Sequence, residues 1–336
     1  MFELPFFLQQ LITERFETLA AHNPQARQQL QRAVAALSHS YLKGSDQGHL
    51  QGDLAILAYL SARLPATYAV GSACLQIVKH LEPQWQPDTL VDLGAGPGSM
   101  SLAALAYYQP RHHVLYEADA RMIQAGKAIF AAGNIQAHWH QGYLPQLPTL
   151  PVASGPRLWL AGYVLNELSP AHREKWYARL QSQWQPEDRL LLIEPGTPRG
   201  YQHILEARTA FLAQGNSVGG PCPHQQACPL PTEDWCHFSE RLPRSPLHRY
   251  LKGGERNFED EKYAYLWVSP QAVAPVHAAR LLREPRHHKG HMQLRLCTAD
   301  GVKDPVVGKK NPAYKTLKKS HWGDGLDAKT LAGVLS

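Results

Sequence analysis

The sequence predicts an α/β protein with a doubly wound, mostly parallel sheet, preceded by helices and interrupted late by a cysteine-rich loop. Residues 89–93 form a short apolar run that ends in the glycine-rich stretch 94–98, and residues 101–105 have a helical pattern. A strand, a glycine turn and a helix in that order begin a doubly wound unit. Helical stretches separate most of the later apolar runs, so the sheet is expected to be mostly parallel. These runs predict strands at 114–117, 137–139, 158–161, 190–194, 263–268 and 292–297.

The first part of the chain has the apolar spacing of helices. Apolar residues recur at helical intervals from Phe6 to about Leu42, Asn23 and Pro24 mark a break, and helical patterns continue through 55–60 and 66–81. The chain therefore divides by pattern into four parts. They are a helical region at 1–84, a Rossmann-like core at 85–200, a cysteine-rich basic arm at 201–262, and a final segment at 263–336 with the remaining strands, a hairpin and a basic tail.

The amino-acid composition indicates which cellular compartment and which kinds of partner to expect. Five cysteines in 336 residues are too few, and an odd number, for a disulfide scaffold, which favours a reducing compartment and hence the cytoplasm. No run of about 18 apolar residues appears, so we expect no membrane partner. The net charge of +6 permits an anionic partner such as a nucleic acid. We expect a monomer.

An acidic residue precedes the glycine turn, and a second acid, Glu117, closes the next predicted strand about twenty residues after the turn. Glycines allow a tight turn and a close approach to a ligand, and an acid at the second position can hydrogen-bond ribose hydroxyls. The Asp-x-Gly-x-Gly-x-Gly form is typical of class I S-adenosylmethionine (SAM) methyltransferases, because SAM has no pyrophosphate and its amine favours nearby acids. A tight turn without a ligand is the alternative. The candidate cofactor-binding residues are Asp92, Gly94, Gly96, Gly98 and Glu117.

Three further acidic or amide residues each have two possible roles. Asn166 and Glu167 follow the fourth predicted strand, where this fold lines its substrate mouth, and they are the candidate catalytic residues. The segment lacks the Asn/Asp-Pro-Pro-aromatic pattern of amino-methylating enzymes, and capping of the next helix explains these residues equally well. Asp119 lies past its strand, so we expect it to cap a helix rather than to bind ribose.

Three of the five cysteines lie in one proline-rich stretch, separated by five and seven residues, and a fourth lies about sixty residues further on. Four thiolates suit either tetrahedral zinc or a [4Fe-4S] cluster. The wide spacing fits the larger cubane, whereas His224 or His237 could complete a Cys3His zinc site. Half-buried thiols without metal are the third alternative. The candidate metal ligands are Cys222, Cys228, Cys236 and Cys297.

The position of Cys297, the fourth candidate ligand, depends on where its predicted strand lies. If residues 292–297 closed the main sheet, Cys297 would point away from the face where the arm leaves, so we expect these residues to form a hairpin outside the sheet. The remaining cysteine, Cys74, lies in an apolar helical pattern and is expected in the core.

Two basic segments contain aromatic residues. Such mixtures can neutralise phosphates and stack on bases of RNA, although a solvated face is the simpler explanation. The first segment contains Arg241, Arg244, His248, Arg249, Tyr250 and Lys252. The second contains Lys303, Lys309, Lys310, Tyr314, Lys315, Lys318, Lys319 and Trp322.

Taken together, these motifs resemble the methyltransferase-like assembly factors of the small ribosomal subunit, the Rsm-type factors described for mitochondria that have bacterial relatives. The resemblance runs from about residue 62 to residue 324. Its most specific parts are residues 92–99, the Cys-Pro-His arm with 235–238, residues 259–263 and residues 296–298.

The resemblance implies a factor of ribosome biogenesis, and so of translation, that binds SAM, a [4Fe-4S] cluster on Cys222, Cys228, Cys236 and Cys297, and 16S-type rRNA of the small subunit. It also implies that methyl transfer has been lost, although Asp92 and the glycines are intact here. The alternative is an active SAM-dependent methyltransferase acting on rRNA or a ribosomal protein, with zinc or iron–sulfur as a structural metal. Glutamates in the first helix are unlike a transit peptide, so we expect a bacterial, cytoplasmic member.

Overall fold

The structure, a computed structural model, describes residues 2–43, 52–146 and 155–335. The chain begins with α1 (Phe6–His22), α2 (Ala26–Lys43) and α3 (Asp53–Leu81), and the break between α1 and α2 falls at Asn23 and Pro24 as predicted. The helical patterns at 55–60 and 66–81 belong to one helix, α3, which continues through Pro65. Among the described helices α3 alone is long and apolar enough to cross a membrane, but 83% of its most apolar window is buried inside the protein, as in a core helix.

The main sheet has eight strands in the order β3-β2-β1-β4-β5-β8-β6, with β7 also paired to β8. Strands β1 to β5 are parallel, and β8 is antiparallel to its neighbours. A parallel 3-2-1-4-5 order extended by an antiparallel strand is the arrangement of the class I methyltransferase fold, so the predicted fold class is confirmed. The strands are β1 (Thr89–Leu93), β2 (His112–Glu117), β3 (His138–Gln141), β4 (Arg157–Gly162), β5 (Arg189–Pro195), β6 (Ser217–Gly220), β7 (Phe238–Pro243) and β8 (Phe258–Ser269).

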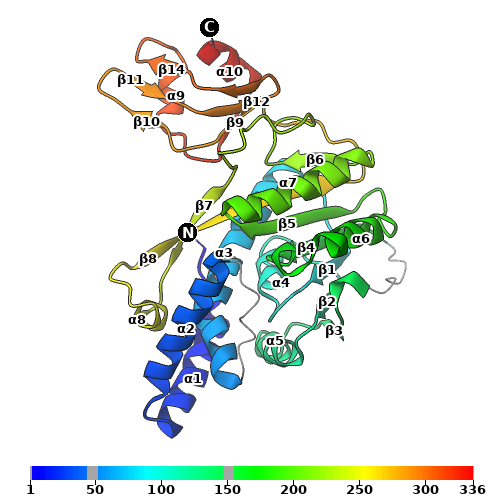
Figure 1. Cartoon of the computed structure of the whole chain (residues 1–336), viewed down its shortest axis with the longest axis vertical. Coiled ribbons are helices and arrows are strands. Elements are labelled where there is room, and N and C mark those ends of the chain that lie inside the picture. The colour runs from blue at the N-terminus through cyan, green and yellow to red at the C-terminus, as the bar shows by residue number, and fades with distance from the viewer. Residues whose placement is uncertain (1, 44–51, 147–154, 336) are drawn as a thin grey trace.

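Helices cover both faces of this sheet (Figure 1). Neighbouring residues of one strand enter different cores: Leu90 packs with α3 and α4, whereas Val91 packs with α6 and α7. Burial on both faces explains the nearly continuous apolar runs of the central strands. The covering helices after α3 are α4 (Ser99–Ala104), α5 (Ala120–Ala132), α6 (Pro170–Gln181) and α7 (Pro198–Ala213); α8 (Pro246–Leu251) packs beside α2 and α3.

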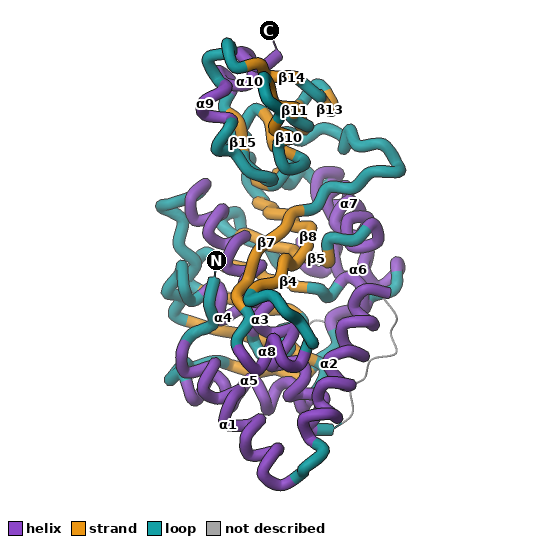
Figure 2. Tube along the Cα trace, turned by 90° about the vertical axis from the view of Figure 1, so that its left-hand side faces the viewer, coloured by secondary structure: helices purple, strands orange, loops and turns teal. Residues whose placement is uncertain are grey.

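Residues 271–335 form a separate C-terminal unit with its own small core, which lies beyond one end of the main sheet (Figures 1 and 2). It has one sheet in the order β10-β11-β14 and another in the order β13-β12-β9-β15. Its elements are β9 (Ala279–Leu281), β10 (Arg286–His287), β11 (His291–Gln293), β12 (Leu296–Thr298), β13 (Gly301–Lys303), β14 (Val306–Gly308), α9 (Tyr314–Leu317), β15 (Gly325–Leu326) and α10 (Ala328–Leu335).

The predicted single strand at 292–297 is wrong, but its predicted place outside the main sheet is confirmed. The residues divide between β11 and β12, which belong to different sheets. Their partners β14 and β13 are separated by Asp304 and Pro305, and a proline has no N–H for a ladder. Cys297 lies on β12, paired with Val302 in the expected hairpin.

The segment 201–262 is more regular than its prolines suggested. It contains most of α7, then β6, β7, α8 and the start of β8, so the irregular part is confined to the loop 221–237. Strands β6 and β7 both pair with the edge of β8 opposite β5, one after the other. The cysteine loop therefore connects β6 to β7 and leaves the sheet at the point along β8 where one strand ends and the other begins.

Candidate cofactor sites

The glycine turn joins β1 to α4 in the way that the sequence predicts. Gly94, Gly96 and Gly98 have φ angles of +70°, +55° and +89°, which residues other than glycine rarely adopt. The turn is held from the next strand, since the N–H groups of Gly94 and Ala95 both donate to the carbonyl of Tyr116 at 2.9 Å. Gly94 and Gly96 are therefore partly exposed at the carboxyl ends of β1 and β2, whereas Gly98 is buried.

Glu117 lies at this turn, as expected. Its Oε2 accepts the N–H of Gly96 at 2.8 Å, and its Oε1 accepts the N–H groups of Ala118 at 2.8 Å and Asp119 at 2.9 Å. Asp119 is the N-cap of α5, its side chain accepting the N–H of Arg121, so the predicted capping role is confirmed. The structure thus brings the two acids and the glycines of the predicted SAM site together.

Asp92 is a buried carboxyl, only 1% exposed. Its Oδ2 accepts the N–H of Ser101 at 3.1 Å and the hydroxyl of Ser101 at 2.7 Å, which ties β1 to α4. Among the described residues Oδ1 has no hydrogen-bond partner. Burial has the largest effect on the pKa of Asp92 and raises this pKa to about 7, although the two hydrogen bonds from Ser101 act to lower it. A cationic ligand group near Oδ1 would stabilise the charged form.

This pKa predicts a pH-dependent stability. A carboxyl whose folded pKa lies above its unfolded value contributes stability that is present below the unfolded pKa of about 4 and lost as the pH rises through about 7. The difference corresponds to a loss on the order of 4 kcal/mol in the free energy of unfolding. Asp92→Asn should therefore flatten much of the decline between pH 4 and 7 in urea unfolding. Asp300→Asn, on the exposed β12–β13 turn, should leave the profile parallel to the wild type; a parallel Asp92→Asn profile would contradict the assignment.

The loop after β4 carries the candidate catalytic residues. Asn166 donates from Nδ2 to Oε2 of Glu194 at 2.7 Å, and the N–H of Leu165 donates to Oε1 at 2.8 Å. Glu194, at the end of β5, is completely buried, and this burial raises its pKa. His203 Nδ1 lies 3.9 Å from the same carboxylate. Glu167 is exposed, so the structure directs Asn166 inward and Glu167 outward.

All four candidate metal ligands line one cavity between the sheet and the C-terminal unit. Three of the thiols come from the loop between β6 and β7, and Cys297 comes from β12. The remaining cysteine, Cys74, is buried in α3, as predicted. The four candidates are therefore brought to one place from segments that lie far apart in the sequence.

The thiols share an apolar and positively flanked environment. Burial, together with the neighbouring Cys222 and Cys228, raises the pKa of Cys297 to about 12, although Arg208 and Arg280 act to lower it. Both arginines are buried and line the cavity. Arg208 donates to the carbonyls of His224 and Gln226 at 3.0 and 2.6 Å. A cationic metal group is the kind of ligand that would let such thiols ionise together.

The four thiols line one cavity, but they are not arranged as a site for a single metal ion. Across the described ranges, no group of three or more His, Cys, Asp and Glu side chains is arranged to hold a single metal ion. His224 Nε2 lies 3.5 Å from Cys297 Sγ. His237 instead stacks on Trp235 with ring centroids 5.1 Å apart, and its Nδ1 lies 3.1 Å from the Trp235 carbonyl.

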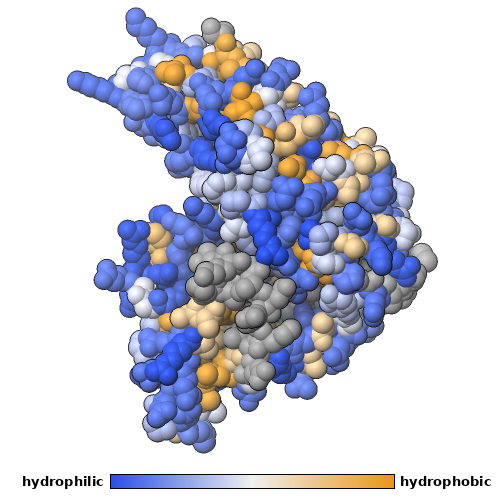
Figure 3. Space-filling view, viewed as in Figure 1, coloured by the Kyte–Doolittle hydropathy of each residue, from blue (hydrophilic) through white to orange (hydrophobic). Residues whose placement is uncertain are grey.

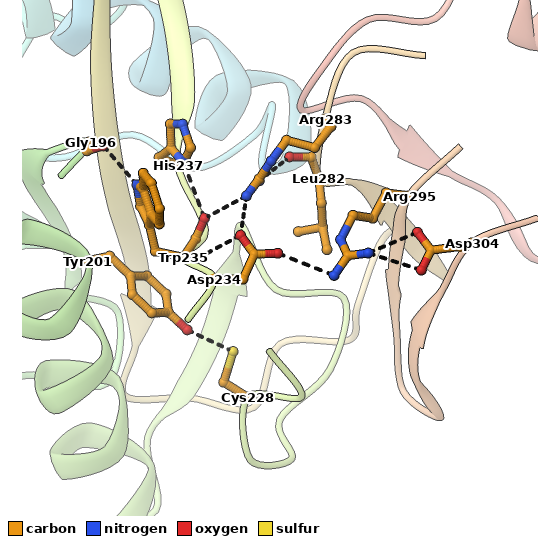
Figure 4. Close-up of polar contacts among 10 residues, drawn as sticks. All are labelled: Gly196, Tyr201, Cys228, Asp234, Trp235, His237, Leu282, Arg283, Arg295 and Asp304. Carbon is orange, nitrogen blue, oxygen red and sulfur yellow. Dashed lines mark hydrogen bonds and ion pairs between the residues drawn. The ribbon is translucent and has the colours of Figure 1, made fainter. Parts of the chain in front are cut away.

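Sequence reasoning missed the residues that support these cysteines. Tyr201 of α7 lies with its hydroxyl oxygen 3.1 Å from Cys228 Sγ (Figure 4). Arg208 follows two turns later on the same helix, and Arg280 of β9 donates to the carbonyls of Pro221 and Gly323. None of the three stands in a motif. The only sequence signal is the helical spacing of positions 201 and 208, which predicts that Tyr201 and Arg208 lie on the same face of one helix.

Ion pairs join the cysteine loop to the C-terminal unit. Asp234 of the loop pairs with Arg283, and its other oxygen lies 3.3 Å from Arg295, which also pairs with Asp304 at 3.0 Å (Figure 4). On the other side Trp235 donates to the carbonyl of Gly196 at 3.0 Å. The loop is therefore fixed both to the main sheet and to the C-terminal unit.

The first predicted basic segment is largely neutralised by the acids of β8. Arg241 pairs with Asp260 at 2.7 Å, and Arg244 and Lys252 pair with Glu259 at 2.8 and 2.9 Å. In the second segment Tyr314 is buried in the C-terminal core. The cations of the first segment are therefore largely paired. In the second segment Lys309, Lys310, Lys315, Lys318 and Lys319 are exposed.

The fold and the two sites define a methyltransferase-like protein with a glycine-turn site and a separate four-thiol cavity. The particular family is shown by a match to residues 53–327. The chain belongs to the Rsm22 family, whose model is described as mitochondrial small ribosomal subunit Rsm22.

Two curated relatives are similar over most of this chain. The human mitochondrial ribosome assembly protein METTL17 is 26% identical over 303 residues, covering 82% of this chain and 63% of that protein. The mitochondrial Rsm22-cox11 tandem protein 2 of Schizosaccharomyces pombe is 25% identical over 330 residues, covering 81% of this chain and 43% of that protein. The chain thus spans less than two thirds of the length of either relative.

Solved methyltransferases match the sheet region only distantly. A SAM-dependent methyltransferase from Aquifex aeolicus has a TM-score of 0.41 and 12% identity, covering 63% of this chain and 95% of that one. A ribosomal protein L11 methylase from Lactobacillus delbrueckii has a TM-score of 0.35 and 11% identity, covering 60% and 79%. The fold assignment rests on the strand order described above.

Proposed function

We propose that this protein is an assembly factor of the small ribosomal subunit that binds 16S-type rRNA and carries two ligands, SAM at the glycine turn and a [4Fe-4S] cluster in the thiol cavity. The observation that carries the proposal is the convergence of four cysteines on one cavity in a chain of the Rsm22 family. The name of the human relative, a ribosome assembly protein, supports the assignment to assembly.

The donor set fits an iron–sulfur cluster. Cys222, Cys228, Cys236 and Cys297 would supply four thiolates, the ligand set of a cubane. The wide spacing of the three loop cysteines fits the larger cubane better than a single zinc ion. When bound, such a cluster would connect the loop, through three thiolates, to the C-terminal unit, through the thiolate of Cys297. The buried charges of Arg208 and Arg280 would offset the negative charge of the thiolates.

The glycine turn fits SAM. Glu117 lies beside the turn, where ribose hydroxyls are bound in this fold, and the unpartnered Oδ1 of Asp92 suits an amine. In the proposed role these residues bind and orient SAM, and methyl transfer is not required. The proposed setting is the reducing cytoplasm of a bacterial cell, where thiols stay available for iron.

An active methyltransferase acting on rRNA or a ribosomal protein is the second candidate, and the intact glycine turn with Asp92 favours it. Against it, the amide of Asn166 is engaged by Glu194. Radiolabel transfer from SAM to isolated small subunits separates the two candidates, because only an active enzyme labels them.

The direct test is an anaerobic visible spectrum of the purified protein, with iron, sulfide and zinc analysis and sedimentation with small subunits. We expect a broad band near 400 nm, roughly where thiolate-bound clusters absorb, about four irons per chain, and cosedimentation. Stoichiometric zinc without iron would overturn the cluster. Absence of the iron-loaded protein from the subunit fraction would overturn the assembly role.

A further inference from the structure

The net positive charge of this chain comes from one part of it. Residues 271–336 contain 12 Lys and Arg against 5 Asp and Glu, a net charge of +7, whereas residues 1–270 contain 22 against 23, a net charge of −1. The whole excess of the protein, +6, therefore comes from the C-terminal unit. Any site for a polyanion that depends on net charge belongs there.

Within that unit, some cations are used to hold the fold together. Arg283 and Arg295 pair with Asp234, and Arg280 donates to two backbone carbonyls. These side chains are buried or half-buried. They account for the attachment of the unit to the cysteine loop and leave the more distant cations for another role.

Four exposed cations lie on two adjacent turns, and we call them the basic tip: Arg286, Lys289, Lys309 and Lys310. The first two lie on β10 and the turn that follows it, and the other two follow β14 directly. The turns are neighbours because β11 pairs with both β10 and β14, and the N–H of Lys309 donates to the carbonyl of Gly290 at 3.1 Å. None of the four has a carboxylate partner among the residues that the structure describes.

A second group of cations continues this charge. Lys315, Lys318 and Lys319 are exposed on and just after α9, while Tyr314 and Leu317 of the same short helix are buried in the core of the unit. The helix thus presents its lysines outward. Hydrophilic residues dominate much of the outer end of the C-terminal unit in Figure 3.

We propose that the basic tip binds the backbone phosphates of structured RNA, so that the C-terminal unit, and not the paired Arg241 and Arg244, carries the nucleic-acid interface. This inference rests on the proposed function and names the surface that would serve it. Unpaired lysines and arginines on exposed turns can displace the counterions of a phosphate backbone without breaking internal ion pairs. The stacked rings of His288 and His291, 4.6 Å apart, lie on the same hairpin and add flat polar groups beside the cations.

The test compares two quadruple variants with equal loss of charge. The tip variant carries Arg286→Gln, Lys289→Gln, Lys309→Gln and Lys310→Gln. The control carries Lys127→Gln, Lys175→Gln, Arg241→Gln and Arg256→Gln, four exposed cations outside the C-terminal unit. Binding of a fluorescein-labelled helix-and-loop transcript of 16S-type rRNA is measured by anisotropy over a range of salt concentrations, with vesicles of phosphatidylcholine and phosphatidylglycerol as the competing anionic surface. Thermal melting establishes that both variants fold.

The tip variant is expected to bind the transcript at least tenfold more weakly, with a log–log salt slope smaller by about 3, since each lost phosphate contact removes roughly 0.7–0.9. The control should keep most of the wild-type affinity. Equal losses in both variants, or no loss in the tip variant while the wild type binds, would overturn the inference and leave the assembly role standing. A wild type that binds vesicles but neither the transcript nor small subunits would overturn both.

Discussion

Cys228→Ala is expected to lose most of the bound iron and to weaken binding to small-subunit rRNA at least tenfold, while the main sheet stays folded. The cysteine loop is proline-rich and has little core of its own, so metal–thiolate links would supply much of the energy that orders it. The loop pairs with Arg283 and Arg295 of the C-terminal unit, and disorder in the loop would loosen that unit as well. Iron analysis, far-UV circular dichroism and anisotropy with labelled rRNA measure the three effects.

Cys74→Ala is the matched control for this variant. Cys74 is also buried, but it lies in α3 and does not line the thiol cavity. It should therefore cost a modest amount of stability, as other small core truncations do, and leave the iron content unchanged. A folded Cys228→Ala protein that keeps both its iron and its affinity would refute the role given to the cavity.

Gly98→Ala should lower the free energy of unfolding by about 2–5 kcal/mol. The residue has a φ of +89°, and an added Cβ would lie 2.5 Å from Cε2 of Phe130. The left-handed backbone costs roughly 1–2 kcal/mol, and overpacking against the aromatic ring costs about 1–3 kcal/mol more. Urea denaturation measures the change.

Two other glycines separate the causes of that loss. Gly253→Ala, with a φ of +60° and open space around it, should show only the backbone cost. At Gly96 the nearest atom to an added Cβ is the hydroxyl oxygen of Tyr59 at 3.5 Å, so Gly96→Ala should be mildly destabilising but should weaken SAM binding at least tenfold in calorimetry. If Gly98→Ala were no more destabilising than Gly253→Ala, the turn would be less tightly packed than described.

The sequence was informative wherever a single segment carries the whole pattern. The apolar runs and the glycines of residues 89–98 predict their own strand and turn, because strand burial and positive φ are local requirements. Most of helix α7 lies in the segment 201–262, which the sequence assigns to a cysteine-rich arm, although Pro198 suits the first turn of a helix.

The contacts that surround the candidate sites could not be predicted in the same way, because they join residues far apart in the sequence. The partners of Arg241 and Lys252 stand on β8, and only the pairing of β7 with β8 brings Asp260 and Glu259 to them. Arg280 reaches the thiol cavity from a different sheet altogether. Such contacts depend on how distant segments pack, and a single sequence carries no sign of that packing.

The uneven distribution of charge has a consequence for how this molecule meets a polyanion. A body of −1 joined to a unit of +7 is an electric dipole, and a field that extends about a Debye length turns a dipole before contact is made. The C-terminal unit would therefore arrive first. Orientation in advance of contact raises the rate of productive collisions, and raising the salt concentration would slow association well before it affected the fold.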